Sequence, residues 1–287
     1  REQAVIATTI DGPGTGPRSS FGIELFAMLR FLTAGESHGQ ALVVTLDGMP
    51  AGLQLDIDAL NTQLRRRQGG YGRGRRMAIE SDRAEILAGV RHGRTTGAPI
   101  ALLIRNRDWV NWQQTMYVEA EMPEGATGTK RSGVTRPRPG HADLAGAVKY
   151  GHDDIRDVLE RASARETAAR VAAGSLARQL LGQFGVHIAS HVSAIGSVVL
   201  PESRVVSFEE AQAQPDDAPL RCVDEALQQQ MIAAIDAAKA AGDTIGGAFE
   251  VIATGLPPGL GSYVQWDRKR SEEHTSELQS RLHLVCR

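Results

Sequence analysis

Cysteines and long apolar runs are scarce in this sequence. Its 287 residues include 2 cysteines, Cys222 and Cys286, which lie far apart and lack the spacing of a metal-binding pair. They define no disulfide framework, which favours a reducing compartment, and we expect a cytoplasmic protein. Since no apolar run approaches the ~20 residues that a helix needs to span a bilayer, we expect no membrane partner.

An excess of one charge is also lacking. The chain has 32 Lys and Arg residues against 34 Asp and Glu residues, for a formal net charge of −2. This balance argues against bulk nucleic-acid binding as the main activity. With 41% hydrophobic and 23% charged residues, the composition is typical of a globular protein with one large domain or two small ones.

Hydrophobic periodicity predicts strands mixed with helices. The expected strands cover residues 29–34, 41–46, 100–104, 187–200 and 248–254, and the expected helices cover 56–66, 154–184 and 224–241. We expect Asp56 to cap the first helix, Gly242 to end the third, and the strand at 187–200 to bend near Gly196. Strands and helices do not alternate strictly, so a doubly wound parallel sheet is not favoured.

The most informative segment is Gly35-Glu-Ser-His-Gly39, which places His38 in a turn between two apolar segments. The flanking glycines allow the backbone to bend sharply and a planar ligand to approach closely. A free imidazole titrates near neutral pH and can therefore shuttle protons. A hairpin turn that merely contains a histidine fits the spacing equally well.

A basic, glycine-rich segment covers residues 64–77. Its arginines are Arg65, Arg66, Arg67, Arg73, Arg75 and Arg76. Arginine binds phosphates and carboxylates bidentately, and the intervening glycines can expose backbone N–H groups to oxyanions. An exposed basic loop without a ligand and a nucleic-acid-binding segment are the alternatives.

A second histidine follows two prolines in Arg136-Pro-Arg-Pro-Gly-His-Ala-Asp143. The stiff loop can fix the orientation of His141. Asp143 either orients a ring nitrogen of this histidine or caps the helix that follows. A metal site built from His141, Asp143, His152 and Asp153 matches no closed zinc set, so we expect no metal.

The segment from Glu160 to Leu176 opens the long predicted helix. Arg161 and the backbone N–H groups near it favour the binding of a phosphate or another oxyanion. In the alternative interpretation, Arg161 and Arg165 are solvated helix charges that pair with Glu160 and Glu166.

These four segments, in this order, resemble the signature motifs of the chorismate synthase family, and the resemblance covers roughly 28–270. It implies an α+β fold, a β-α-β sandwich with helices packed between antiparallel sheets, and a homotetramer when the chain is complete. It also implies a lyase of the shikimate pathway, in aromatic amino acid biosynthesis. The expected reaction is 1,4-anti-elimination of phosphate from a small anionic substrate, 5-enolpyruvylshikimate 3-phosphate, giving chorismate.

The resemblance also implies cofactors and residue roles. The reaction has no net redox change, yet the family needs reduced FMN, with NADPH as a reductant in some members. Two catalytic residues are implied: His38, which protonates the reduced flavin near N1, and His141, which assists phosphate departure. The cofactor-binding residues implied are Arg67 and Arg73 for the nicotinamide, and Arg161, Ala162 and Ser163 for the flavin.

Both ends of the chain depart from this resemblance. We interpret 1–27 as a non-native, disordered leader, 28–269 as the chorismate synthase domain, incomplete at its C-terminus, and 270–287 as a foreign tail resembling a translated sequencing adapter. The family's third signature, with further flavin contacts and an aspartate, has no counterpart. We therefore expect the chain as it stands to be an inactive fragment.

Two other functions stay open. One is an arginine- and glycine-rich nucleic-acid-binding protein, whose affinity would fall steeply with salt. The other is a flavin oxidoreductase with net hydride transfer, which would consume reductant at every turnover.

Overall fold

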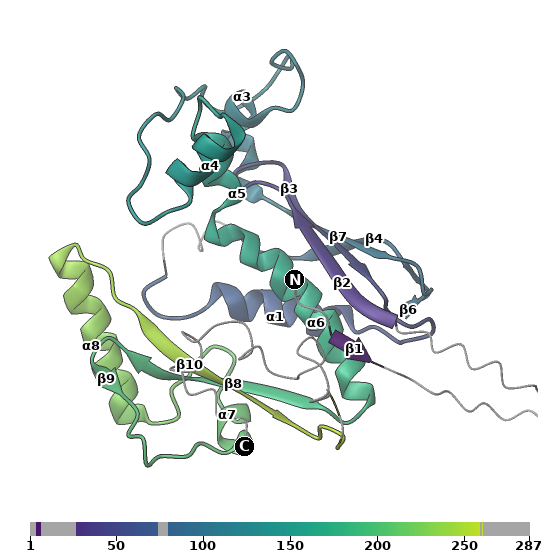
Figure 1. The fold of residues 1–287 in the computed structure, drawn as a ribbon, viewed down its shortest axis with the longest axis vertical. Coiled ribbons are helices and arrows are strands. Elements are labelled where there is room, and N and C mark those ends of the chain that lie inside the picture. Colours follow the sequence, from purple (N-terminus) through teal and green to yellow (C-terminus); the bar gives the residue numbers. More distant parts are fainter. Residues whose placement is uncertain (1–3, 7–26, 74–79, 259, 261–287) are drawn as a thin grey trace, which may run out of the picture. The chain divides into compact units, whose positions relative to one another are not determined.

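The computed structural model describes residues 4–6, 27–73, 80–258 and 260. It divides into two compact units, Arg1–Gly69 with Arg73–Gln179, and Gly70–Gly72 with Leu180–Arg287. Helices are mixed with sheets in which the strand pairs are antiparallel (Figure 1). The predicted α+β class is confirmed.

A five-stranded sheet with the order β1-β2-β3-β7-β4 organises the first unit. Its strands are β1 (Ala4–Ile6), β2 (Ala27–Ala34), β3 (Ala41–Asp47), β4 (Ala84–Ala88) and β7 (Ile100–Arg105). A small ribbon pairs β5 (Val90–Arg91) with β6 (Arg94–Thr95). One face of β3 and β7 is fully buried, because alternate apolar residues oppose each other there: Leu42 and Ile104, Val44 and Leu102, Leu46 and Ile100.

The helical elements of this unit follow and interrupt the strands. They are α1 (Ile57–Gln68), η1 (Arg107–Asn111), α3 (Gln113–Met116), α4 (Asp143–Tyr150), α5 (Arg156–Arg161), η2 (Ala164–Glu166) and α6 (Thr167–Gln183), whose residues from Leu180 on belong to the second unit. Figure 1 shows α1 and α6 running beside the sheet. Small buried residues line α6, namely Ala168, Ala169, Ala172 and Ala173, which allows other elements to pack closely against this helix.

The predicted helix at 154–184 is wrong in one respect, since it is not continuous. The helix α5 ends at Arg161, and Ser163 starts a new helical segment by accepting a hydrogen bond from the backbone N–H of Arg165. Hydrophobic periodicity does not reveal this break, because Ala162 continues the apolar pattern between the two helical segments. The serine side chain ends the first helix locally by capping the second.

The second unit contains a three-stranded sheet with the order β10-β8-β9. Its elements are β8 (His187–Ile195), β9 (Val198–Val199), α7 (Phe208–Gln212), α8 (Glu225–Ala241) and β10 (Gly247–Thr254). The predicted bend is confirmed, because Gly196 has a φ of +57° between β8 and β9. A core that includes Met231, Ala211 and Cys222 fixes both helices against the sheet.

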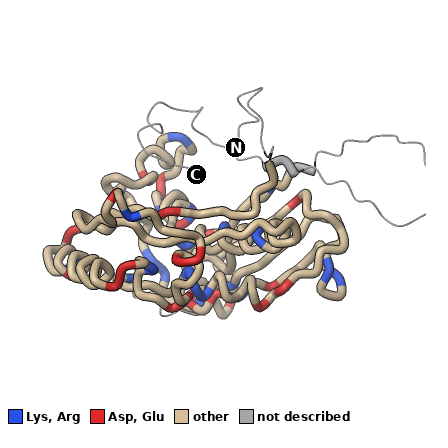
Figure 2. The backbone as a smooth tube through the Cα atoms, turned by 90° about the horizontal axis from the view of Figure 1, so that it is seen from below, with Lys and Arg blue, Asp and Glu red and all other residues tan. Residues whose placement is uncertain are grey.

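Local signals at helix ends also behave as predicted. Asp56 caps α1, and Gly242 adopts the left-handed conformation at the end of α8. Figure 2 shows basic and acidic residues interspersed along the described chain. In the part of the chain that the structure describes, no helix combines the length and apolarity required to cross a membrane.

The predicted leader and tail are only partly described. Residues 4–6 form β1 and pair with β2, in keeping with the strand preference of Val and Ile, and the interpretation of 1–27 as a leader stays a prediction. The rest of the predicted leader except Ala27, and the predicted tail at 270–287, lie outside the described residues.

Candidate active site

The turn that carries His38 connects β2 to β3 in an antiparallel hairpin. Gly35 has a φ of +102°, and a Cβ atom there would collide with the backbone of Ala41, so the bend requires glycine. The side-chain amide of Asn106 donates to the carbonyls of Glu36 at 3.1 Å and Gly39 at 2.7 Å. Hydrogen bonds from the buried Asn106 side chain therefore hold the backbone of this turn in place.

The imidazole of His38 is held on several sides. Oε2 of Glu160, on α5, accepts a hydrogen bond from the His38 backbone N–H at 2.8 Å, and both carboxylate oxygens lie within 2.9 Å of Nδ1. The Trp112 ring stacks on the imidazole, with centroids 3.8 Å apart. At the opposite edge, Nε2 lies 3.9 Å from Oδ2 of Asp108. A histidine fixed in this way is suited to hold or pass on a proton.

The predicted flavin-binding residues lie next to the same turn. Arg161 donates to the carbonyls of Thr33 at 2.8 Å and Gly35 at 3.1 Å. The Ser163 hydroxyl lies 2.9 Å from that of Ser37. The structure thus brings Arg161 and Ser163 to the His38 turn, while their binding of a flavin, like that of the exposed Ala162, stays a prediction.

His141 lies just before α4. Its Nδ1 is 2.7 Å from Oδ1 of Asp143, whose side chain is 0% exposed. Arg138 donates to the same carboxylate through its backbone N–H, Nε and Nη2. These hydrogen bonds hold the pKa of Asp143 well below its usual range. Asp143 therefore orients the histidine, whereas Ala142 occupies the N-cap position of α4.

The two histidine clusters are connected electrostatically. Hydrogen bonding to Asp143 is the main cause that raises the pKa of Arg138, and attraction to Glu160 adds to it. Arg138 binds the carboxylate that contacts His141, and Glu160 is the carboxylate that contacts His38. The charges around both imidazoles therefore act on the same guanidinium.

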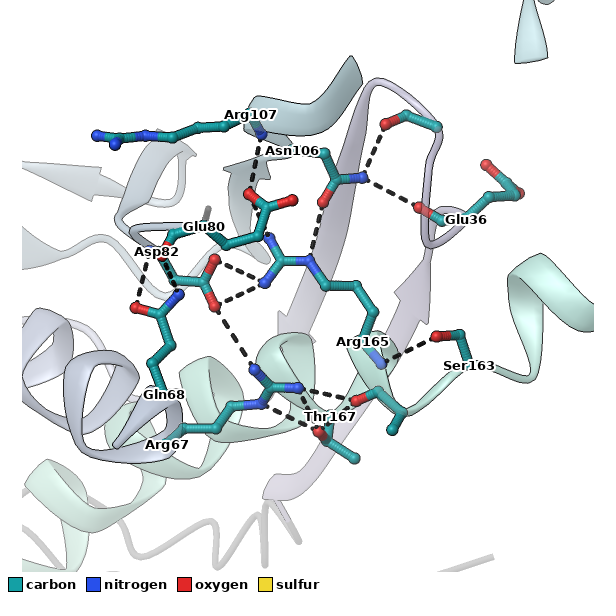
Figure 3. Close-up of polar contacts among 12 residues, drawn as sticks. Glu36, Arg67, Gln68, Glu80, Asp82, Asn106, Arg107, Ser163, Arg165 and Thr167 are labelled. Atoms are coloured by element: carbon teal, nitrogen blue, oxygen red, sulfur yellow. Dashed lines mark hydrogen bonds and ion pairs between the residues drawn. The ribbon is translucent and has the colours of Figure 1, made fainter. Parts of the chain in front are cut away.

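A buried ionic network lies behind the His38 turn (Figure 3). The Arg165 side chain is 4% exposed, and its Nη1 lies 2.6 Å from Oδ1 of Asp82. Its Nη2 lies 3.7 Å from Oε2 of Glu80, and its Nε donates to Asn106 at 2.9 Å. Because Asn106 also holds the turn by hydrogen bonds, this network connects the turn to η2, which carries Arg165. The interpretation of Arg165 as a solvated charge is wrong.

Arg67 takes part in the same network. Its Nε and Nη2 donate to Thr167 at 3.0 and 2.8 Å, and its Nη1 lies 3.6 Å from Oδ2 of Asp82. Burial lowers the pKa of Arg67, and Asp82 opposes that shift. Arg73 is exposed and donates to the carbonyl of Gly69. Their assignment to a nicotinamide stays a prediction, and Arg75 and Arg76 lie outside the described residues.

A pocket of about 600 Å³ opens beside Trp112 and is lined by Arg131, Arg136 and Arg156. The guanidinium carbon of Arg131 lies 3.9 Å from the centroid of the Trp112 ring. The same ring stacks on His38, so Trp112 contacts both the pocket and the imidazole. Its volume falls in the usual range of small-molecule sites, and its lining favours an anionic ligand.

Several residues of this site escape sequence reasoning. Glu160 lies within a recognised motif, but its pairing with His38 bridges 122 residues, and only its burial would have distinguished it from a surface charge. Trp112 and Asn106 belong to no recognised motif. Among the described residues, no group of three or more His, Cys, Asp or Glu side chains is placed to hold a metal ion.

Comparisons with known proteins agree on one family. A sequence model described as chorismate synthase matches residues 29–277. The chain is 55% identical over 244 residues to the chorismate synthase of Symbiobacterium thermophilum, covering 84% of this chain and 62% of that protein. It is 54% identical over 252 residues to chorismate synthase 2 of Bacillus cereus, covering 88% of this chain and 64% of that protein.

A solved crystal structure of a chorismate synthase is similar as well. It shares 41% sequence identity with this chain at a TM-score of 0.65, and the match covers 84% of this chain and 62% of that one. The chain therefore spans less than two thirds of the length of these relatives.

Proposed function

Since this chain belongs to the chorismate synthase family, we propose that its function is the 1,4-anti-elimination of phosphate from 5-enolpyruvylshikimate 3-phosphate. The product, chorismate, feeds aromatic amino acid biosynthesis. The observation that carries the proposal is His38, held in a braced turn between Glu160 and Trp112. Such a group supplies the proton chemistry that an elimination requires.

The proposed substrate carries a phosphate and two carboxylates. Arginine suits such a ligand because its planar fork binds these groups bidentately. Arg131, Arg136 and Arg156 line the pocket beside Trp112, and we assign them to substrate anions. Arg67 and Arg73 are proposed to contribute to a site for NADPH as reductant.

Reduced FMN is the proposed cofactor, and the residues present fit a planar, anionic group. Arg161 and Ser163 lie beside the His38 turn with the exposed Ala162 between them, so we assign these three residues to flavin binding. Bound reduced FMN would lend electron density to the substrate and recover it, which leaves no net redox change.

The protein's own part in the reaction is proton transfer. His38 is proposed to supply a proton from its imidazole to the flavin site. His141 is proposed to assist phosphate departure. Its Nδ1 contacts Asp143, so Nε2 is the nitrogen that would face the departing phosphate. Removal of either general acid should lower the rate roughly 10²–10⁴-fold.

The proposal extends to assembly and location. We propose a cytoplasmic homotetramer, as the family implies. Apolar residues exposed on α4 support an association of copies, since exposed apolar surface often marks an interface; these are Leu144, Val148 and Tyr150, which are 62%, 76% and 67% exposed. Light scattering of the purified protein measures the number of copies.

Complementation tests the proposed function. Because the chain covers 62% of the Symbiobacterium relative, residues 28–269 are joined to that relative's C-terminal part and expressed in a bacterium lacking its own chorismate synthase. We expect growth without aromatic amino acids, and no growth for the same chimera with His38→Gln. A folded chimera that fails to restore growth, where the complete relative succeeds, would contradict the proposal.

A further inference from the structure

Glu160 is a buried carboxylate directed at a single histidine. Its side chain is 0% exposed. Its Oε2 accepts the backbone N–H of His38 at 2.8 Å, and its two oxygens lie 2.9 and 2.8 Å from Nδ1 of the same residue. Its backbone carbonyl accepts the N–H of Ser37 at 3.0 Å. Glu160 therefore binds both the backbone and the ring of the His38 turn.

The chemistry of this contact selects one form of the ring. An ionised carboxylate accepts hydrogen bonds and donates none. Glu160 acts as the acceptor here, since its Oε2 accepts the His38 backbone N–H at 2.8 Å, and Nη1 of Arg156 lies 4.0 Å from its Oε1. The ring nitrogen that faces Glu160 must then carry a proton, because two acceptors at 2.8 Å would repel each other.

The other nitrogen of the ring faces a different environment. Nε2 lies 3.9 Å from Oδ2 of Asp108, beyond hydrogen-bonding distance. The His38 side chain is 21% exposed, and the stacked Trp112 blocks one ring face. Nε2 is thus the ring nitrogen that a ligand or solvent can reach.

We propose that Glu160 is a positioning residue that holds neutral His38 as the Nδ1–H tautomer, so that Nε2 is the atom at which this histidine takes up and releases protons. The catalytic meaning of the proposal rests on the proposed function. The tautomer itself does not, and it can be measured without any turnover. The proton on Nδ1 stays there throughout, while the exchanged proton binds and leaves at Nε2 alone.

Nitrogen NMR of the imidazole tests the proposal on the chain as it stands. The protein is labelled with ¹⁵N-histidine and studied at a pH where imidazole is neutral. His38→Gln identifies the signals of His38 among those of the 8 histidines. We expect Nδ1 of His38 to show the signal of a protonated nitrogen and Nε2 that of a bare one. An Nε2–H tautomer in the unmodified chain would overturn the proposal by itself.

The variant Glu160→Gln keeps the shape and removes the charge. Its amide N–H₂ can donate to Nδ1, which then becomes an acceptor. We expect the ratio of the Nδ1–H to the Nε2–H tautomer to fall by roughly tenfold or more, as for the loss of a charge-assisted bond. An unchanged ratio in a folded variant would contradict the assignment.

Two controls separate this effect from general loosening. Glu166→Gln removes a carboxylate that contacts Thr33 and Arg170, and it should leave the His38 signals in place. His141, whose Nδ1 contacts Asp143, reports on folding in the same spectrum. If Glu160→Gln changes His141 as much as His38, the effect is structural and the positioning role is wrong.

Discussion

Replacement of Arg165 by methionine should strongly destabilise the first unit. The guanidinium is surrounded by the carboxylates of Asp82 and Glu80, whose side chains are 0% and 1% exposed. Methionine fills similar space but removes the guanidinium from these two buried carboxylates, and Asp82 keeps only the 3.6 Å contact with Arg67 as an ion pair. Removal of one member of a buried ion pair costs about 3–5 kcal/mol, since the remaining charge stays desolvated.

That cost corresponds to a measurable shift in melting temperature. At about 2–4 °C per kcal/mol for a unit of this size, Arg165→Met should lower the Tm by roughly 6–20 °C. Circular dichroism on heating gives the Tm, and urea unfolding gives the free energy where the transition is reversible and two-state.

Arg170→Met is the matched control. Its side chain is 58% exposed and pairs with Glu166 at 3.0 Å, and exposed pairs of this kind contribute about 0–1 kcal/mol. Combining Arg165→Met with Asp82→Asn should cost less than the sum of the single changes, because the two groups interact directly. Equal Tm shifts for Arg165→Met and Arg170→Met would refute the reasoning.

Three further predictions concern the candidate site. In the chimera with a complete C-terminal part, His38→Ala and His141→Ala should each lower turnover roughly 10²–10⁴-fold, and full activity in both would remove these residues from the mechanism. Arg67→Ala should lower the Tm more than Arg73→Ala, because Arg67 is bound to Thr167 and Asp82; equal shifts would show that its contacts contribute nothing. The pKa of Asp143 is lower in the folded than in the unfolded chain, so its stabilisation is present above the unfolded pKa of about 4 and is lost as the pH falls. The free energy of unfolding, measured in urea, should therefore fall more between about pH 5 and about pH 3 in the unmodified chain than in Asp143→Asn. Parallel pH dependences in the two proteins would exclude this linkage.

Local sequence signals predict the elements that depend on nearest neighbours. Asp56 and Gly242 mark helix ends through their own side-chain and backbone chemistry, and the structure places them there. The alternating apolar residues of β3 and β7 predict the buried face of the first sheet. These features need no knowledge of distant residues.

The rest depends on contacts between distant parts of the chain. The pairs Arg165–Asp82 and His38–Glu160 are separated by 83 and 122 residues in the sequence. Local hydrophobic periodicity therefore does not predict that these side chains are buried together. The break after Arg161 has a local cause, the Ser163 cap on the Arg165 N–H, and periodicity misses it because Ala162 continues the apolar pattern. The sequence identifies both histidines and offers Asp143 as a partner of His141, but it does not identify Glu160 as the partner of His38.

The stoichiometry of phosphate and reductant tests the central claim most directly. The chimera is incubated anaerobically with reduced FMN and 5-enolpyruvylshikimate 3-phosphate, while phosphate release and flavin absorbance are recorded together. A lyase should release many phosphates for each flavin oxidised, and His38→Gln should slow that release without changing the ratio. One flavin oxidised per phosphate, or no phosphate from a folded chimera, would contradict the account.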